Sequence, residues 1–222
     1  MEVTEFHTFD ELARDAAELL AEHLCAPRLG PHAVLLTGGK TVRGVYARLV
    51  AAPVRADPNL HVLLTDERHV PVDDPESNYG HMRGLLAACG VDEARIHRVR
   101  TELDLDAAAA RYDAELAAFF AAGGEVTLGF LGLGADGHVA SLFSAEDVAR
   151  GAGRCALAVR RPSGPARVSI TRDVLWRVTR LAFLVAGPDK AGAIDRLIHR
   201  PATIPAGIAL AEKDHVELWC AP

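Results

Sequence analysis

Hydrophobic residues along the chain follow two patterns, a helical spacing and short continuous runs. Residues 9–24, FDELARDAAELLAEHL, place apolar side chains three and four positions apart, which predicts an amphipathic helix. Thr8 and Glu11 predict a capping box that begins this helix. Further helices are predicted at 41–52, around 77–89, at 104–124 and at 189–199, with a short one beginning in VASLF at 139–143.

The continuous apolar runs predict buried strands. They fall at 33–39, 60–67, 126–131, 181–187 and 215–220, with shorter β-like pieces at 94–99 and within 155–171. Runs without polar alternation are typical of parallel strands that are covered on both faces. Because these strands alternate with helices and no repeat or linker interrupts them, residues 1–222 predict a single doubly wound α/β domain, with a mostly parallel sheet between two layers of helices.

Polar or glycine-rich segments follow four of the predicted strands. These segments are TGGKT, TDERHVP, GLGADGH and AGPDK. In an open parallel sheet, ligands bind beyond the carboxyl ends of the strands. We therefore expect the four segments to meet around one cleft.

Composition and charge exclude several classes of function. The net charge of −6 predicts no broad basic surface, so we expect no nucleic-acid partner. No apolar run approaches the roughly 20 residues of a membrane span, and the acidic N-terminus does not resemble a signal peptide. The cysteines are widely spaced and are predicted to be reduced core thiols in a cytoplasmic protein: Cys25, Cys89, Cys155 and Cys220. We expect no metal site, because the histidines show no ligand spacing.

Gly132, Gly134 and Gly137 fit the G-x-G-x-x-G spacing of a dinucleotide-binding turn. The next strand-like stretch, however, ends in arginines rather than in the acid that binds a ribose. His138 in the same loop suggests different chemistry, because an imidazole at a strand exit can face a cleft and act as a general base. Asp136 is the candidate partner of this base, and a structural histidine that donates to a backbone carbonyl is the alternative.

The segment Gly39-Lys40-Thr41 resembles the end of a P-loop, but Val34 stands where the first Walker glycine is required. What remains is a short glycine turn before a helix, either a site for one phosphate or a turn without a ligand. Arg68 is a candidate clamp for phosphate or carboxylate, with a solvated loop as the alternative. Lys190, at the start of a helix, is either a second phosphate ligand or a surface lysine.

Taken together, these stretches resemble the 6-phosphogluconolactonase family. TGGKTVRGVYARL is similar to the family segment SGGSTPKGLYELL, TDERHVPVDDPESNYG to DERxVPxxxxxSNYG, and LGLGADGHVASLF to LGxGxDGHxASLF. RVSIT and the GPDKA segment are similar to the RxTLT and GxxKA segments near the end of the family pattern. The resemblance implies a fold related to glucosamine-6-phosphate isomerase and ribose-5-phosphate isomerase. It also implies cytosolic hydrolysis of 6-phospho-D-glucono-1,5-lactone in the pentose phosphate pathway, without a metal, nucleotide or other cofactor.

The resemblance assigns roles to individual positions. His138 takes the place of the family's general base. The residues at phosphate-binding or motif positions are Gly38, Gly39, Thr41, Asp66, Arg68, Ser77, Asn78, Arg167 and Lys190. Lys40 departs from the family's serine and adds a positive charge to the glycine turn. The expected partner is a small sugar phosphate, and the sequence leaves the oligomeric state open, a monomer included.

Two other functions stay open at this point. An amino-sugar phosphate isomerase or deaminase shares the glycine turn and the Asp-Gly-His loop, but it usually carries an acid a few residues beyond that loop. Here the segment reads SLF, and Arg68-His69-Val70-Pro71 follows the family pattern of the lactonases. The second alternative is a sugar-phosphate binding module without catalysis.

Overall fold

The computed structural model describes all residues from 1 to 222. A parallel sheet forms the centre of the protein. The seven strands lie in the order β1-β10-β9-β6-β2-β3-β5. Their bounds are β1 Glu2–Glu5, β2 His32–Leu36, β3 Leu60–Leu64, β5 Ile96–His97, β6 Glu125–Leu131, β9 Val178–Ala186 and β10 Glu217–Ala221. The predicted doubly wound α/β fold with a mostly parallel sheet is confirmed.

Helices connect these strands. They are α1 Phe9–Cys25, α2 Lys40–Ala51, α3 Asn78–Ala88, α4 Leu105–Ala121, α5 Ala145–Arg150, α6 Arg172–Arg177, α7 Ala191–His199 and α8 Pro205–Ala209. Short 3₁₀ turns occupy η1 Glu93–Arg95, η2 Pro188–Lys190 and η3 Pro201–Thr203. The predicted capping box of α1 is confirmed, since the Thr8 hydroxyl accepts from the Glu11 amide at 3.2 Å and the Glu11 carboxylate accepts from the Thr8 amide at 3.1 Å.

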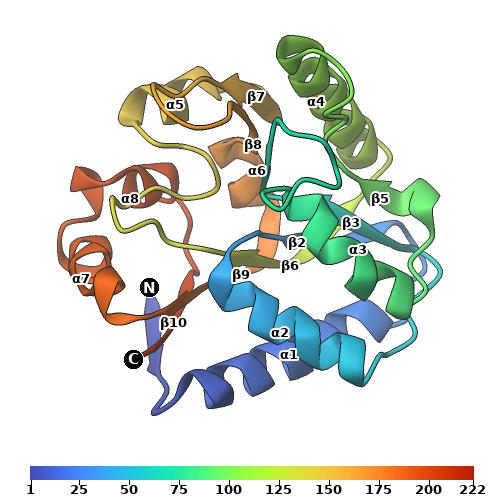
Figure 1. The fold of residues 1–222 in the computed structure, drawn as a ribbon, viewed down its shortest axis with the longest axis horizontal. Coiled ribbons are helices and arrows are strands. Elements are labelled where there is room, and N and C mark those ends of the chain that lie inside the picture. The colour runs from blue at the N-terminus through green and yellow to red at the C-terminus, as the bar shows by residue number, and fades with distance from the viewer.

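The central sheet is buried on both faces. Successive residues of β2 point in opposite directions: Val34 and Leu36 belong to the cluster beneath α1, α2 and α3, whereas Ala33 and Leu35 belong to the cluster beneath α4. Figure 1 shows α1 and α2 side by side on one side of the sheet, and α4 on the other side close to β7. This double coverage explains why the strands are apolar without alternation.

A second sheet of three antiparallel strands lies beside the first. Its order is β4-β8-β7, with β4 at Asp66–Arg68, β8 at Arg167–Ile170 and β7 at Ala156–Val159. The predicted single strand at 60–67 is therefore wrong, because the chain changes sheets at Thr65. The amide of Thr65 donates to the Leu36 carbonyl at 2.8 Å, while its carbonyl accepts from the Ile170 amide at 2.9 Å.

Other local predictions need correction. The VASLF segment begins no helix: Val139 and Leu142 form an isolated bridge, and α5 begins only at Ala145. Strand β1 and helices α6 and α8 were not predicted, and the strand expected at 94–99 is reduced to two residues.

The four cysteines are all free, as predicted. Only Cys89 is a buried core thiol, however, and Cys25 is exposed. None of the helices combines the length and the apolar character that a bilayer crossing requires.

Candidate active site

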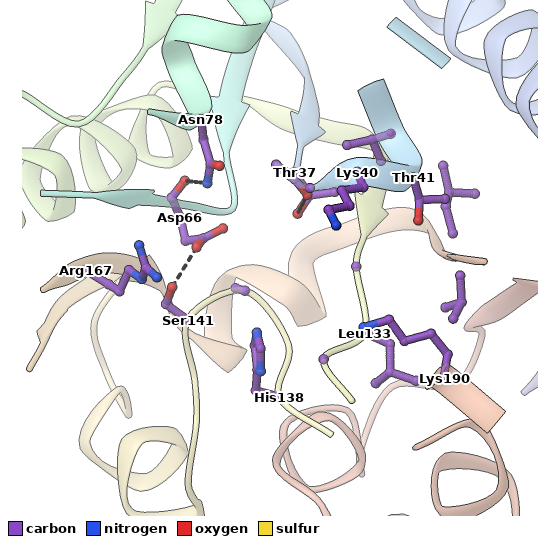
Figure 2. A pocket seen from close by; sticks show the side chains of 18 of the residues that line it. Thr37, Lys40, Thr41, Asp66, Asn78, Leu133, His138, Ser141, Arg167 and Lys190 are labelled. Carbon is purple, nitrogen blue, oxygen red and sulfur yellow. Dashed lines mark hydrogen bonds between the residues drawn. The ribbon is translucent and has the colours of Figure 1, made fainter. Parts of the chain in front are cut away.

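The four polar strand exits meet at one cavity, as the sequence predicts. The cavity has a volume of about 590 Å³ and is lined by residues from the segment after β2, from β4, from the loop after β6 and from the turn after β9. Figure 2 shows His138 between two groups of side chains, with Lys40, Thr41 and Lys190 on one side and Asp66 and Arg167 on the other. Cationic groups therefore flank the imidazole on both sides.

The loop after β6 fixes the orientation of His138. Its ring Nδ1 lies 2.6 Å from Asp136 Oδ1, and its backbone amide donates to the same oxygen at 3.2 Å. With Nδ1 hydrogen-bonded to a carboxylate, the tautomer with Nδ1 protonated is favoured, and Nε2 keeps a lone pair. A side chain at Gly134 would collide with this arrangement, because a Cβ there would lie 2.1 Å from the His138 Nδ1. The glycine makes room for the aspartate–histidine pair.

The electrostatics of Asp136 agree with that pairing. Burial of its carboxyl group acts to raise the pKa, but the charge of His138 and the hydrogen bonds from its ring and backbone outweigh burial. The pKa of Asp136 consequently lies below its usual value, so the carboxylate form is favoured next to the imidazole.

The aromatic ring of Phe143 packs against the His138 imidazole. Its ring centroid lies 4.5 Å from that of His138, with the two planes tilted by 48°. Phe143 is held in place through its backbone amide, which donates to Asp147 Oδ2 at 3.1 Å. An apolar ring rather than a second carboxylate therefore packs against the imidazole.

The glycine turn after β2 forms another wall. Gly38, Gly39, Lys40 and Thr41 all line the cavity, and α2 begins here without a side-chain cap or an acid in its first turn. The free amides and the positive end of the helix dipole suit an anion. Asn78 packs so closely on Gly38 that a Cβ at this glycine would lie 1.9 Å from the Asn78 Oδ1. Asn78 thus supports the shape of the turn.

Two arginines lie opposite each other in the small sheet. Arg68 of β4 and Arg167 of β8 are partners in the antiparallel register, and both line the cavity. The Arg167 side chain is buried, and its Nε and Nη1 have no hydrogen-bond partner. Arg68 donates from Nη1 to the Glu76 carbonyl at 2.7 Å, but its buried Nε also has no partner. Like charges directly opposite on a ladder are destabilising, so this arginine pair suits an anionic ligand.

Asp66 lies near the arginine pair in a network of hydroxyl groups. Its Oδ2 accepts from the Ser141 hydroxyl at 2.6 Å and its Oδ1 from the Thr65 hydroxyl at 2.9 Å. The side-chain Nδ2 of Asn78 donates to the backbone carbonyl oxygen of Asp66 at 2.9 Å, and Figure 2 shows this bond together with the Ser141 bond. This network joins β4, α3 and the loop after β6 at the cavity wall.

Ser77 does not reach the cavity. Its hydroxyl caps α3 by accepting from the Gly80 amide at 2.9 Å and donates to Glu67 Oε2 at 3.1 Å. Glu67 is almost completely buried and accepts from the amides of Arg68, Asn78 and Tyr79, each at 2.7 Å. Burial, only partly opposed by these hydrogen bonds, raises the pKa of Glu67. Ser77 and Glu67 therefore position β4 and α3, and they do not contact a ligand in the cavity.

Most residues predicted from the sequence are brought together, and several lining residues were missed. The predicted residues in the lining are Gly38, Gly39, Lys40, Thr41, Asp66, Arg68, Asn78, His138, Arg167 and Lys190. Asp136 stands behind His138. The missed lining residues with functional groups include Thr37, Ser141, Phe143, Arg161 and Asp189, whose carboxylate lies 3.3 Å from the Lys190 ammonium. Position 161 lies within a Pro/Gly-rich loop, and this loop contains no sequence pattern that would identify Arg161 as a site residue. No cluster of three or more His, Cys, Asp or Glu side chains has the arrangement of a metal site.

Comparison with known proteins agrees with this geometry. The profile of the glucosamine-6-phosphate isomerases/6-phosphogluconolactonase family matches residues 7–219. The chain belongs to this family. Within it, the chain is 32% identical over 176 residues to a protein named 6-phosphogluconolactonase from Haemophilus influenzae, covering 78% of this chain and 75% of the relative.

Solved structures give the same family fold. The crystal structure of 6-phosphogluconolactonase from Thermotoga maritima superimposes with a TM-score of 0.78 at 25% identity, covering 99% of this chain and 98% of the other. A monomeric glucosamine-6-phosphate deaminase has a TM-score of 0.80 at 20% identity, covering 100% and 97%. The second likeness concerns the fold alone, so the family match leaves two chemistries to distinguish.

Proposed function

We propose that the protein hydrolyses 6-phospho-D-glucono-1,5-lactone to 6-phospho-D-gluconate, a reaction of the oxidative pentose phosphate pathway. One observation carries the proposal: His138, held at Nδ1 by Asp136, lines a cavity that also contains an uncapped helix start and unpaired cationic side chains. A neutral ester next to a basic nitrogen and a phosphate next to cations fit these two features. The names of the relatives above 30% identity support the same substrate.

Binding of the phosphate would fix the far end of the substrate. Two parts of the cavity are alternative phosphate sites. One is the glycine turn with Thr41 and the Lys190 ammonium on one side of His138, and the other is the arginine pair Arg68 and Arg167 on the opposite side (Figure 2). Lys40 adds a charge to the same turn. Anchoring a remote group lowers the entropic cost of placing the lactone carbonyl next to the base.

His138 would then act as the general base. Its Nε2 removes a proton from a water molecule, whose oxygen attacks the lactone carbonyl carbon. Backbone amides of the glycine segments or a neighbouring cation stabilise the resulting oxyanion. When the intermediate collapses, the bond between carbonyl carbon and ring oxygen breaks, and the ring oxygen takes the proton from the imidazole. General-base help of this kind contributes about 10²–10⁴-fold to a rate.

Phe143 favours this reaction over amino-sugar deamination. The deaminases usually carry an acid a few residues beyond the Asp-Gly-His loop, and here that stretch places an aromatic ring 4.5 Å from the imidazole. Position 143 therefore supplies no carboxylate that could join His138 in a proton relay.

A coupled assay tests the proposal. Glucose-6-phosphate dehydrogenase generates the lactone in situ, and the purified protein is expected to speed its disappearance well above the spontaneous rate. Glucosamine 6-phosphate is expected to release no ammonia. Ammonia release without lactone hydrolysis would assign the deaminase activity instead. Tight binding of 6-phosphogluconate without turnover of either compound would assign a binding module.

A further inference from the structure

Arg161 lies in the loop between β7 and β8 and lines the same cavity as Arg68 and Arg167. Its side chain is the exposed member of the three. The guanidinium carbon lies 4.2 Å from the centroid of the Phe143 ring. No carboxylate forms an ion pair with Arg161. The cation is thus positioned by an aromatic ring and not neutralised by an acid.

The preceding residue behaves differently. Arg160 donates to Asp106 Oδ2 at 2.6 Å and lines a separate hollow on the side of α4 and β7. The side chains of two consecutive arginines in one loop therefore lie in different environments. One forms an exposed ion pair, and the other faces the cavity with its charge unpaired.

Arg68, Arg161 and Arg167 repel one another electrostatically, and a bound anion would relieve this repulsion. Burial, and then the positive charges of Arg68 and Arg161, lower the pKa of the Arg167 guanidinium. Asp66 offsets part of this repulsion, but its carboxylate oxygens already accept from Ser141 and Thr65. The Nε and Nη1 of the buried Arg167 stay without a partner. Buried donors of this kind are normally hydrogen-bonded, so a ligand with acceptor oxygens would supply the partners that the protein does not.

The contact with Phe143 positions the Arg161 guanidinium for binding an anion. A guanidinium over a ring face is attracted by the ring quadrupole and keeps its N–H groups free to donate. Phe143 contacts His138 as well as Arg161, so the cation is held close to the imidazole. A planar fork of donors is suited to phosphate oxygens.

We propose that Arg161 binds the substrate phosphate, completing with Arg68 and Arg167 a three-arginine anion site. The identity of the substrate rests on the proposed function. The recognised chemistry, a sugar phosphate held by guanidinium groups, can also be tested by binding alone.

Arg161→Ala is compared with Arg160→Ala, which removes a neighbouring arginine of the same loop without changing the cavity lining. We expect Arg161→Ala to raise KM for the phosphorylated lactone, and Kd for 6-phosphogluconate measured by calorimetry, about tenfold, with kcat within about threefold. Arg160→Ala is expected to match the wild type. Arg161→Lys keeps the charge but loses the planar fork, so its KM should fall between those of the wild type and Arg161→Ala.

Three outcomes would overturn the inference. The first is a KM and Kd of Arg161→Ala equal to those of Arg160→Ala. The second is an equal loss of kcat/KM on unphosphorylated glucono-1,5-lactone, which would mean that Arg161 acts only through Phe143 and His138. The third is a wild-type protein that does not bind 6-phosphogluconate. A wild-type protein that binds 6-phosphogluconate without hydrolysing the lactone would reject the proposed function, and the Kd comparison would still decide the role of Arg161.

Discussion

At the scale of single residues, the proposed chemistry depends on the orientation of the His138 imidazole. Asp136 precedes His138 by two positions, and a tight turn brings its carboxylate within hydrogen-bond distance of the imidazole. Gly134 leaves space for both side chains. The carboxylate favours the tautomer in which Nε2 is the basic nitrogen. In the proposed mechanism Asp136 is therefore a positioning residue, which would act on the reaction through His138 because it does not line the cavity itself.

Replacing this carboxylate tests its role. In Asp136→Asn the amide no longer selects one tautomer, so kcat should fall at least about tenfold, and by less than the ~10⁴-fold cost known for a buried orienting aspartate. KM for the phosphorylated lactone should stay within about threefold. Since the Asp136 side chain is 59% exposed, the melting temperature should hardly change. A normal kcat, or a loss explained by a large fall in melting temperature, would show that Asp136 does not position the base.

The sequence predicts the residues that lie in continuous motifs, and it misses those that become neighbours only through folding. His138, Gly38 and Arg68 follow from local patterns at strand exits. The pairing of Arg68 with Arg167 depends on the register of two strands almost a hundred residues apart, which no local pattern contains. Arg161 was missed for the same reason, because its aromatic partner Phe143 belongs to another loop.

At the scale of secondary-structure elements, two histidines contact each other across β3 and the edge strand β5 of the central sheet. His97 of β5 is the register partner of Leu63, two residues beyond His61 in β3. The His61 Nδ1 and the His97 Nε2 lie 2.9 Å apart, and the two ring planes are within 18° of each other. Burial, followed by the nearby charges of His97, Arg95 and His32, lowers the pKa of His61 to about 4. Burial also lowers the pKa of His97.

This pair predicts a loss of stability in acid. The folded-state pKa of His61 lies below the unfolded value of about 6.5, so below that pH the unfolded chain binds a proton that the folded chain refuses. The contribution is complete above about pH 6.5 and is lost as the pH falls towards 4. Chemical denaturation between pH 7 and 4 should show a steeper decline for the wild type than for His61→Gln. Parallel pH profiles for the two proteins would rule out His61 as the cause.

The elements themselves are well predicted where hydrophobicity alone decides them. The amphipathic α1 and the apolar strands β2, β6 and β9 follow directly from their residue patterns. The break at Thr65 could not be predicted, because the residues on either side of it are compatible with one strand. It arises from tertiary pairing, in which Thr65 bonds to both sheets.

At the scale of the whole molecule, the parallel sheet gathers segments from the entire chain at one edge. The segments after β2 and β9 lie about 150 residues apart in sequence, yet both line the cavity of about 590 Å³. The prediction that the strand exits converge is confirmed by this lining. The single domain, the cytoplasmic location and the absence of nucleic-acid partners remain predictions, and the oligomeric state remains open.

The central claim is that this cavity hydrolyses a phosphorylated lactone with His138 as the base. The most direct test is kcat of purified wild type and His138→Ala on 6-phospho-D-glucono-1,5-lactone. His69→Ala serves as the control, since that ring bonds the Leu103 carbonyl at 2.8 Å and lies outside the cavity lining. We predict that His138→Ala lowers kcat about 10²–10⁴-fold while His69→Ala keeps the wild-type value. A kcat of His138→Ala equal to that of the wild type would contradict the assigned base.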